Sequence, residues 1–180
     1  RSALLGCYDG HGRVGEMVSE FVIQHLPQAL LANRNLESDP GQALSEAYLQ
    51  VDDDLAADPN VDATVSGTTA VTCIIKENRL WIANTGDSRA IIARRMPGSS
   101  TLKAIDMTID HKPDSQREMP RLLRMGGHVE PAGANGKPPS RVWHNRRGLA
   151  MARSLGDHAA ATVGVIADAD ITEYTAREDD

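Results

Sequence analysis

The sequence predicts an α+β domain, with two amphipathic helices near its N-terminus followed by a run of antiparallel strands. Apolar residues recur at helical spacing from Val14 to Leu26 and again from Ala43 to Leu55. The segment from Val65 to Ala93 is instead rich in Val, Ile and Thr and is divided by turn residues. Because its connectors are too short for crossover helices, these strands should pair antiparallel.

The first elements have clear boundaries in the sequence. Leu4 to Tyr8 is predicted to be a buried strand, and Asp9-Gly10-His11-Gly12 a turn that leads into the first helix. Pro27 should interrupt or end that helix, since proline lacks the backbone donor that the helix needs. The second helix should begin at Asp39-Pro40, an N-cap followed by proline at the first helical position, and end before Pro59.

The middle of the chain is expected to form a meander of three strands. They are predicted over residues 65–75, 80–83 and 90–93, with Asn78 and Gly86-Asp87-Ser88 as the two turns between them. A further helix is expected from Ser115 to Met125. The last two strands are predicted over residues 163–166 and 171–174.

Length and composition fit one ordinary domain. The 180 residues are 41% hydrophobic and carry a formal net charge of −6. A chain of this size buries roughly 70% of its unfolded surface and needs no metal or disulfide merely to fold. The negative charge argues against nucleic acid or an anionic membrane as a partner, and no apolar run reaches the roughly 20 residues of a membrane span.

The two cysteines bear on the compartment. Cys7 and Cys73 each lie inside an apolar run, where a reduced core thiol is more common than a disulfide. We therefore expect an intracellular protein, cytoplasmic or nuclear.

Glycines follow the first strand at the spacing Gly10-x-Gly12-x-x-Gly15, which also occurs in dinucleotide-binding loops. Asp9 stands directly before them and would repel a pyrophosphate, and no second strand ends in a ribose-binding acid. The residues favour two other interpretations. Asp9-Gly10-His11 is either an ordinary exposed turn or a site where carboxylate and carbonyl oxygens bind Mg²⁺ or Mn²⁺.

Several segments together resemble the metal-dependent protein serine/threonine phosphatases of type 2C. They occur in that family's order and spacing along essentially the whole chain. The segments are Tyr8-Asp9-Gly10-His11-Gly12, Ser66-Gly67-Thr68-Thr69-Ala70, Asn84-Thr85-Gly86-Asp87-Ser88-Arg89, Asp110-His111-Lys112-Pro113, Gly126-Gly127, residues 149–157 and Gly164-Val165-Ile166.

The resemblance implies a sandwich of two antiparallel β-sheets flanked by α-helices, a four-layer fold with metals in a cleft at one end. It implies hydrolysis of phosphoserine and phosphothreonine in proteins by a metal-activated water. Asp9 would bridge two Mg²⁺ or Mn²⁺ ions, Gly10 would offer its carbonyl to one of them, and Asp87 would help to hold a third. His11 would be the general acid.

The resemblance also divides the chain. Residues 1–180 would be a partial catalytic domain, with a flap over about residues 131–147 that contributes to substrate choice. In the flap, Arg146 and Arg147 could meet a phosphorylated substrate or could simply be solvated. Asp157 lies in a matched segment, where we expect it to close a turn and to have only a structural role.

The metal site is the point at which the sequence departs from the family. Of the usual metal carboxylates only Asp9 and Asp87 are present, because the others would lie before Arg1 or after Asp180. We therefore expect residues 1–180 alone to bind metal weakly and to show little activity. The alternative function is a catalytically inactive, phosphatase-like binding or regulatory module. The sequence leaves the oligomeric state open.

Overall fold

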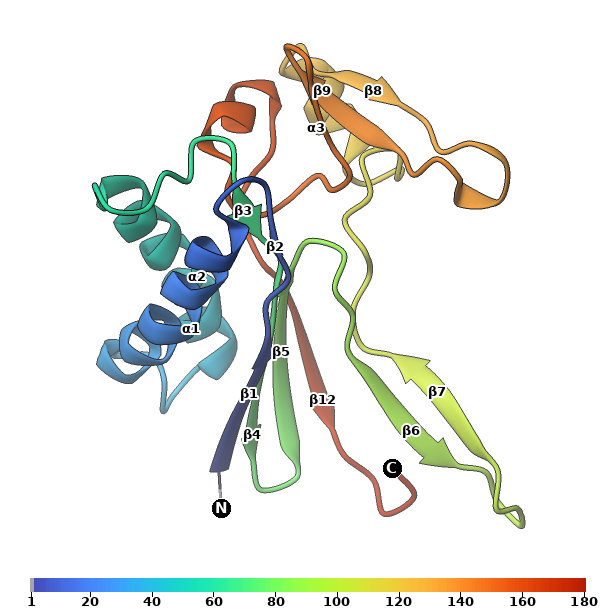
Figure 1. Ribbon diagram of the computed structural model, residues 1–180. Coiled ribbons are helices and arrows are strands. Elements are labelled where there is room, and N and C mark those ends of the chain that lie inside the picture. The colour runs from blue at the N-terminus through green and yellow to red at the C-terminus, as the bar shows by residue number, and fades with distance from the viewer. Residues whose placement is uncertain (1) are drawn as a thin grey trace.

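The computed structural model describes residues 2–180 and shows an α+β fold (Figure 1). Its main sheet is antiparallel and has four strands. In spatial order they are β1 (Ser2–Cys7), β4 (Ala70–Lys76), β5 (Arg79–Thr85) and β12 (Asp170–Thr175). Helices lie along one face of this sheet and a β-hairpin lies beside the other, so the predicted α+β class is confirmed.

The other strands described in residues 2–180 form three small antiparallel sheets. One consists of β11 (Leu155–Gly156), β3 (Gly67–Thr68) and β2 (Gly10–His11); another of β10 (Arg147–Leu149), β9 (Arg141–His144) and β8 (His128–Glu130); the hairpin of β6 (Ile91–Arg95) and β7 (Leu102–Asp106).

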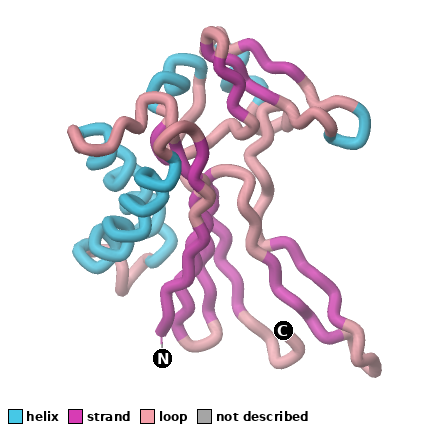
Figure 2. The backbone as a smooth tube through the Cα atoms, viewed as in Figure 1, coloured by secondary structure: helices cyan, strands magenta, loops and turns pink. Residues whose placement is uncertain are grey.

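The two long helices, α1 (Gly15–Ala32) and α2 (Pro40–Ala57), lie together on one side of the main sheet (Figure 2). The short helix α3 (Met119–Arg124) and the 3₁₀ turns η1 (Ala134–Gly136) and η2 (His158–Val163) lie nearer the other small sheets. Among the described residues, no helix combines the length and apolar character that crossing a membrane requires.

Side-chain alternation along the central strands supplies a core on each face of the main sheet. Ile74 and Trp81 pack with the apolar faces of α1 and α2 in the largest cluster. Val71 and Ile82, on the opposite face, pack against Met107 and the hairpin β6–β7. The period of two along a strand thus places one sheet between two apolar layers.

Strand β1 forms as predicted but is not buried. It pairs only with β4 at the edge of the main sheet, and all of its residues are exposed, with Leu5 at 59%. Cys7 is therefore exposed and Cys73 half-buried, and both thiols are free. The prediction of a core position was wrong for Cys7 and correct only in part for Cys73, which packs against the cluster of Val71, Ile82 and Met107. An apolar run indicates a strand but does not say which strand lies at an edge.

Helix α1 continues through Pro27, contrary to the prediction that it would be interrupted there. Proline removes one helical hydrogen bond. Leu26 and Leu30, on either side of that gap, are almost fully buried in the main core. Their burial offsets the lost bond, since the stability of most helices in proteins comes from packing of the apolar face.

The predicted meander is correct only for its first two strands. β4 and β5 pair through a tight turn at Glu77 and Asn78, but β6 pairs with β7 in a separate sheet, and β12 occupies the place beside β5. The chain leaves the main sheet at Gly86, whose backbone N–H donates to His111 Nδ1 at 3.0 Å and whose carbonyl accepts from the His111 backbone N–H at 3.0 Å.

Two later elements also differ in extent from the prediction. Helix α3 is shorter than the expected 115–125, and residues 163–166 form no strand apart from one bridge between Ile166 and Arg153. The predicted final strand is present as β12. The proposed flap, 131–147, contains η1, β9 and the turn into β10, so its second half belongs in part to a small sheet.

Candidate active site

The backbone around Asp9 is held between the end of β1 and the small sheet β11–β3–β2. The Asp9 N–H donates to Thr69 Oγ1 at 3.1 Å, and the Thr69 N–H donates to the Asp9 carbonyl at 3.0 Å. Asp9 is exposed, and within residues 2–180 its carboxylate has no hydrogen bond or ion pair. A fixed backbone with an unpaired carboxylate is a suitable arrangement for a ligand to a hard cation.

The glycine spacing after Asp9 is explained by close packing. A Cβ on Gly10 would lie 2.2 Å from the carbonyl oxygen of Gly15 at the start of α1. Gly12 has a φ of +85°, and a Cβ there would lie 2.7 Å from the Cα of Ser66. These contacts let the turn and the helix approach β3 closely, which L-residues with side chains would prevent.

His11 and Asp157 form a close pair across the small sheet. His11 Nε2 lies 2.6 Å from Asp157 Oδ2, and the two residues are 146 positions apart in the sequence. Strand β3 pairs with β2 on one side and with β11 on the other, which brings them together. Asp157 is 6% exposed, and its Oδ2 also accepts a hydrogen bond from Ser154 Oγ at 2.7 Å.

The surroundings of His11 favour its charged form. Burial would lower the pKa of the ring, but the hydrogen bond to Asp157 and the charge of that carboxylate outweigh it, so the pKa is raised above its usual value. The backbone carbonyl of Asp9 and the charge of Asp87 act in the same direction. A ring whose pKa is raised keeps its proton to a higher pH than an ordinary histidine, which suits it to act as an acid.

The two ring nitrogens of His11 have different environments. Nε2 faces Asp157, whereas Nδ1 is buried and has no hydrogen-bond partner among residues 2–180. Buried polar atoms normally find partners, so an unpaired one in a candidate site calls for a ligand or water.

Asp87 follows Gly86 in the loop after β5 and forms an ion pair with Lys112. The same loop is anchored by His111, which is 1% exposed. Burial and the nearby charge of Arg153 lower the pKa of His111, so its neutral ring can accept the hydrogen bond from Gly86. Asp87 is therefore held in place, but with a cation already beside its carboxylate.

The metal ligands predicted from the sequence fit a hard cation by their chemistry but do not form a complete site. Asp9, Gly10 and Asp87 offer the carboxylate and carbonyl oxygens that Mg²⁺ and Mn²⁺ prefer. Across the described part of the chain, however, no three His, Cys, Asp or Glu side chains gather into a metal-binding group. The unpaired carboxylate of Asp9 is the observation that favours a metal here.

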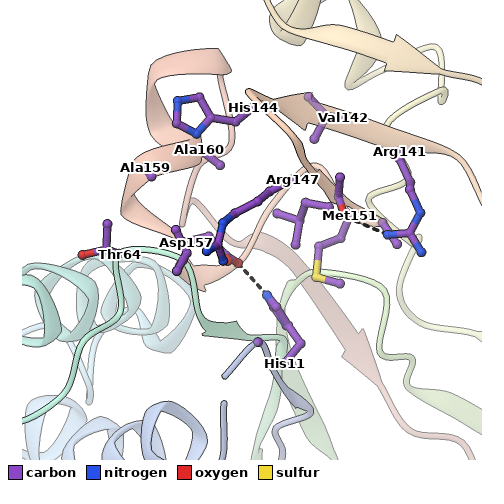
Figure 3. A pocket seen from close by; sticks show the side chains of 15 residues that line it. His11, Thr64, Arg141, Val142, His144, Arg147, Met151, Asp157, Ala159 and Ala160 are labelled. Atoms are coloured by element: carbon purple, nitrogen blue, oxygen red, sulfur yellow. Dashed lines mark hydrogen bonds and ion pairs between the residues drawn. The ribbon is translucent and has the colours of Figure 1, made fainter. Parts of the chain in front are cut away.

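A cavity of about 450 Å³ adjoins the pair of His11 and Asp157. Its walls are largely apolar and come from β9, β10, the following loop and η2. Figure 3 shows His11 and Asp157 pointing toward each other, with the side chain of Arg147 extending toward them from β10. Arg146, its sequence neighbour, lines a different hollow with Trp143 and His128.

Sequence reasoning missed the most direct partner of His11. Asp157 was assigned a structural role, and Ser154 and Lys112 were not given any role in the site. Asp157 does lie in one of the segments that carry the resemblance, which was the available signal. No sequence pattern near Asp157 indicates its contact with His11, since that contact depends on the pairing of strands far apart in the sequence.

Comparisons with known proteins place the chain in the context that its motifs suggest. A family model described as protein phosphatase 2C matches residues 1–180. A rice protein (Oryza sativa subsp. japonica) named probable protein phosphatase 2C 12 is 36% identical over 216 residues, covering 93% of this chain and 54% of that protein. An Arabidopsis thaliana protein named probable protein phosphatase 2C 69 is 37% identical over 170 residues, covering 94% and 43%. The chain spans about half the length of the curated relatives it matches.

Solved structures support the fold. A serine-threonine phosphatase 2C from Toxoplasma gondii superimposes with a TM-score of 0.74 at 18% identity, covering 99% of this chain and 65% of that one. A C. elegans sex determining protein superimposes with a TM-score of 0.79 at 22% identity, covering 99% and 41%. At these identities the likeness concerns the arrangement of the backbone.

Proposed function

We propose, since the chain belongs to the protein phosphatase 2C family, that the protein hydrolyses phosphoserine and phosphothreonine in other proteins in a reaction that requires Mg²⁺ or Mn²⁺. The observation that carries the proposal is the side-by-side placement of two chemically distinct groups. Asp9 presents an unpaired carboxylate, and His11, two residues later, is a half-buried histidine held against Asp157, with its pKa raised.

The metal side of the site would use oxygen ligands from two loops. Asp9 and the Gly10 carbonyl would hold the ions of the main pair, and Asp87 a third. Bound there, such ions generate a nucleophile from water at neutral pH and neutralise charge on the phosphate. The formal charge of −6 makes such help necessary, since the chain itself would repel an anionic substrate.

His11 would supply the proton that the departing serine or threonine oxygen needs. An alkoxide is a poor leaving group, and a positioned acid typically accelerates its departure by roughly 10²–10⁴-fold. The fold keeps this proton on the ring through the contact with Asp157, whose carboxylate stabilises the charged imidazole.

Arg147 is the more suitable of the two candidate substrate arginines. Its side chain extends into the cavity beside His11, where a guanidinium could bind phosphate oxygens in a forked pair of hydrogen bonds (Figure 3). Arg146 opens onto another hollow and would reach only more distant parts of a phosphoprotein. The flap would in this way contribute one direct contact to the substrate.

Two observations favour the alternative, an inactive binding or regulatory module. Asp87 is paired with Lys112, and the described residues hold no group of three metal-ligating side chains. A phosphatase-like surface without a complete metal site could still bind phosphoproteins through Arg147.

The deciding experiment assays the full-length protein on a phosphoserine peptide and on 4-nitrophenyl phosphate, with Mn²⁺ or Mg²⁺ and then with excess chelator. The proposal predicts hydrolysis of both substrates only with metal present. Full activity in chelator would contradict the metal-dependent mechanism. Binding of the phosphopeptide without hydrolysis under any metal condition would favour the inactive module.

A further inference from the structure

We propose that Asp157 is the positioning residue of His11: by accepting the hydrogen bond from Nε2 it leaves Nδ1 as the nitrogen that gives its proton to the departing oxygen. This inference rests on the proposed function, because it concerns how His11 performs the acid step. From the sequence alone, Asp157 is expected only to close a turn after an apolar run.

The backbone of Asp157 has an uncommon conformation and is held by two hydrogen bonds. Its φ of +50° lies in the left-handed region, which is unfavourable for a residue other than glycine. Its N–H donates to the Ser66 carbonyl at 2.9 Å, and its own carbonyl accepts from the Ala160 N–H at 2.7 Å. Strain of this kind persists where the surroundings hold it in place, and here it directs the carboxylate at His11.

Two donors converge on one oxygen of this carboxylate. His11 Nε2 lies 2.6 Å and Ser154 Oγ 2.7 Å from Oδ2. Gly67 leaves the space that this arrangement needs, since a Cβ there would lie 2.3 Å from the same oxygen. Ser154 therefore orients the carboxylate, and the carboxylate in turn orients the imidazole.

The contact also decides which nitrogen can react. An ionised carboxylate only accepts hydrogen bonds, so Nε2 must carry a proton in both the neutral and the charged ring. Nδ1 is then the nitrogen that the Asp157 contact leaves free, and it has no partner among residues 2–180.

The acid step balances with this assignment. The bond between phosphorus and the serine oxygen breaks while a bond between phosphorus and a water oxygen forms. The serine oxygen keeps the electron pair and takes the proton from Nδ1, and the neutral ring keeps Nε2–H bonded to Asp157. The attacking water loses its proton to solvent, and the ring regains one from solvent before the next turnover.

The kinetic test compares Asp157→Asn in the full-length protein with wild type on two leaving groups. Loss of a partner that orients a functional histidine typically costs about 10–100-fold. We expect a loss in kcat of that size on a phosphoserine peptide, little change on 4-nitrophenyl phosphate, and KM within a factor of about two. In a His11→Ala background the same substitution should have no further effect, because Asp157 acts through His11.

Asp52→Asn is the matched control. Asp52 accepts hydrogen bonds from the Gly156 N–H at 2.7 Å and from His158 at 3.2 Å, so it is a second carboxylate beside β11 that does not touch His11. It should leave both substrates unaffected. Ser154→Ala is the second variant. It should give a smaller loss in kcat with the same dependence on leaving group, so the proposal can still be tested if Asp157→Asn folds poorly.

Nitrogen-15 NMR of the His11 ring gives a readout that does not depend on activity. Wild type should show a protonated Nε2 at every pH at which the protein is folded, and Asp157→Asn should lose this preference. Equal losses on both substrates, a full effect of Asp157→Asn in the His11→Ala background, or a neutral ring protonated at Nδ1 in wild type would overturn the positioning role alone. A wild-type protein that hydrolyses neither substrate with any metal would overturn the proposed function and this role with it.

Discussion

The two sides of the candidate site are built to different degrees. On the side of His11, a buried carboxylate, a serine hydroxyl and three short strands fix one imidazole by contacts within residues 2–180. On the side of Asp87, the carboxylate is partly exposed and paired with Lys112, and its loop is held from behind by His111. The difference teaches that strand pairing within residues 2–180 completes the surroundings of His11, whereas the same residues hold no group of three side chains that could bind a metal.

The largest effect is expected from Asp9, the residue between the two sides. Asp9→Ala removes the unpaired carboxylate, so it should reduce metal-dependent hydrolysis to the level seen in chelator. The measurement is the rate on 4-nitrophenyl phosphate over a range of Mn²⁺ concentrations. Asp53→Ala, which removes an exposed carboxylate on α2, is the control and should behave as wild type. If Asp9→Ala kept half of the wild-type rate, Asp9 would not be an essential metal ligand.

The next largest effect tests the side of His11 by itself. His11→Ala should slow hydrolysis of a phosphoserine peptide by roughly 10²–10⁴-fold, the usual range for a general acid. Nitrophenolate leaves without help, so the loss on 4-nitrophenyl phosphate should be far smaller. His128→Ala, at an exposed position on β8, serves as the control. Equal losses on the two substrates would remove His11 from the acid role.

A third prediction concerns the buried charges behind the Asp87 loop. Arg153 donates to both oxygens of Glu118, at 3.0 and 2.7 Å, and also to Asp170 at 3.1 Å. Glu118 is 1% exposed. Glu118→Ala would leave the buried guanidinium with Asp170 as its remaining carboxylate partner, so the cost in unfolding free energy should approach the about 3–5 kcal/mol typical of breaking a buried pair.

Denaturant unfolding measures this cost, and the ion pair of Lys76 with the highly exposed Glu37 provides the comparison. Glu37→Ala should change the unfolding free energy by about 1 kcal/mol or less. Similar values for the two variants would mean that the buried network contributes no more than a surface pair. In that case the support of the Asp87 loop would have to come from other contacts.

The same network predicts how stability changes with pH. Burial alone would raise the pKa of Glu118, but hydrogen bonds from Arg153 and Arg121 and their charges lower it below its usual 4.5. A carboxyl group with a lowered folded pKa stabilises the fold above its unfolded pKa and loses that contribution as pH falls through the folded value. The difference in unfolding free energy between wild type and Glu118→Gln should therefore have its full size at pH 7 and become smaller below about pH 4.5. A difference that grew on acidification would contradict the assignment.

The smallest effect is expected at Lys112. Lys112→Met removes the cation beside Asp87, so Mn²⁺ binding should tighten by a few-fold, equivalent to about 1 kcal/mol or less for a partly exposed pair. Titration calorimetry on the full-length protein measures the change, and Lys103→Met, at an exposed position on β7, is the control. Weaker Mn²⁺ binding in Lys112→Met would show that Lys112 orients Asp87 rather than competing with the cation.

Features set by neighbouring residues could be predicted from the sequence. Asp39 caps α2 by accepting from the Gln42 N–H at 2.9 Å, and Pro40 follows at the first helical position, as their identities indicate. The turn between β4 and β5 likewise lies at Asn78. Such features could be recognised because the groups that satisfy each other lie within a few positions in the chain.

Features set by distant contacts could not be predicted in this way. Pro27 lies within a helix because Leu26 and Leu30 are buried beneath it, and β12, rather than β6, completes the sheet beside β5. The sequence by itself determined the α+β class and singled out Asp9 and His11. Only the tertiary structure placed Asp157 against His11, because their contact depends on two strand pairings across 146 residues, and no local pattern records which strands will meet.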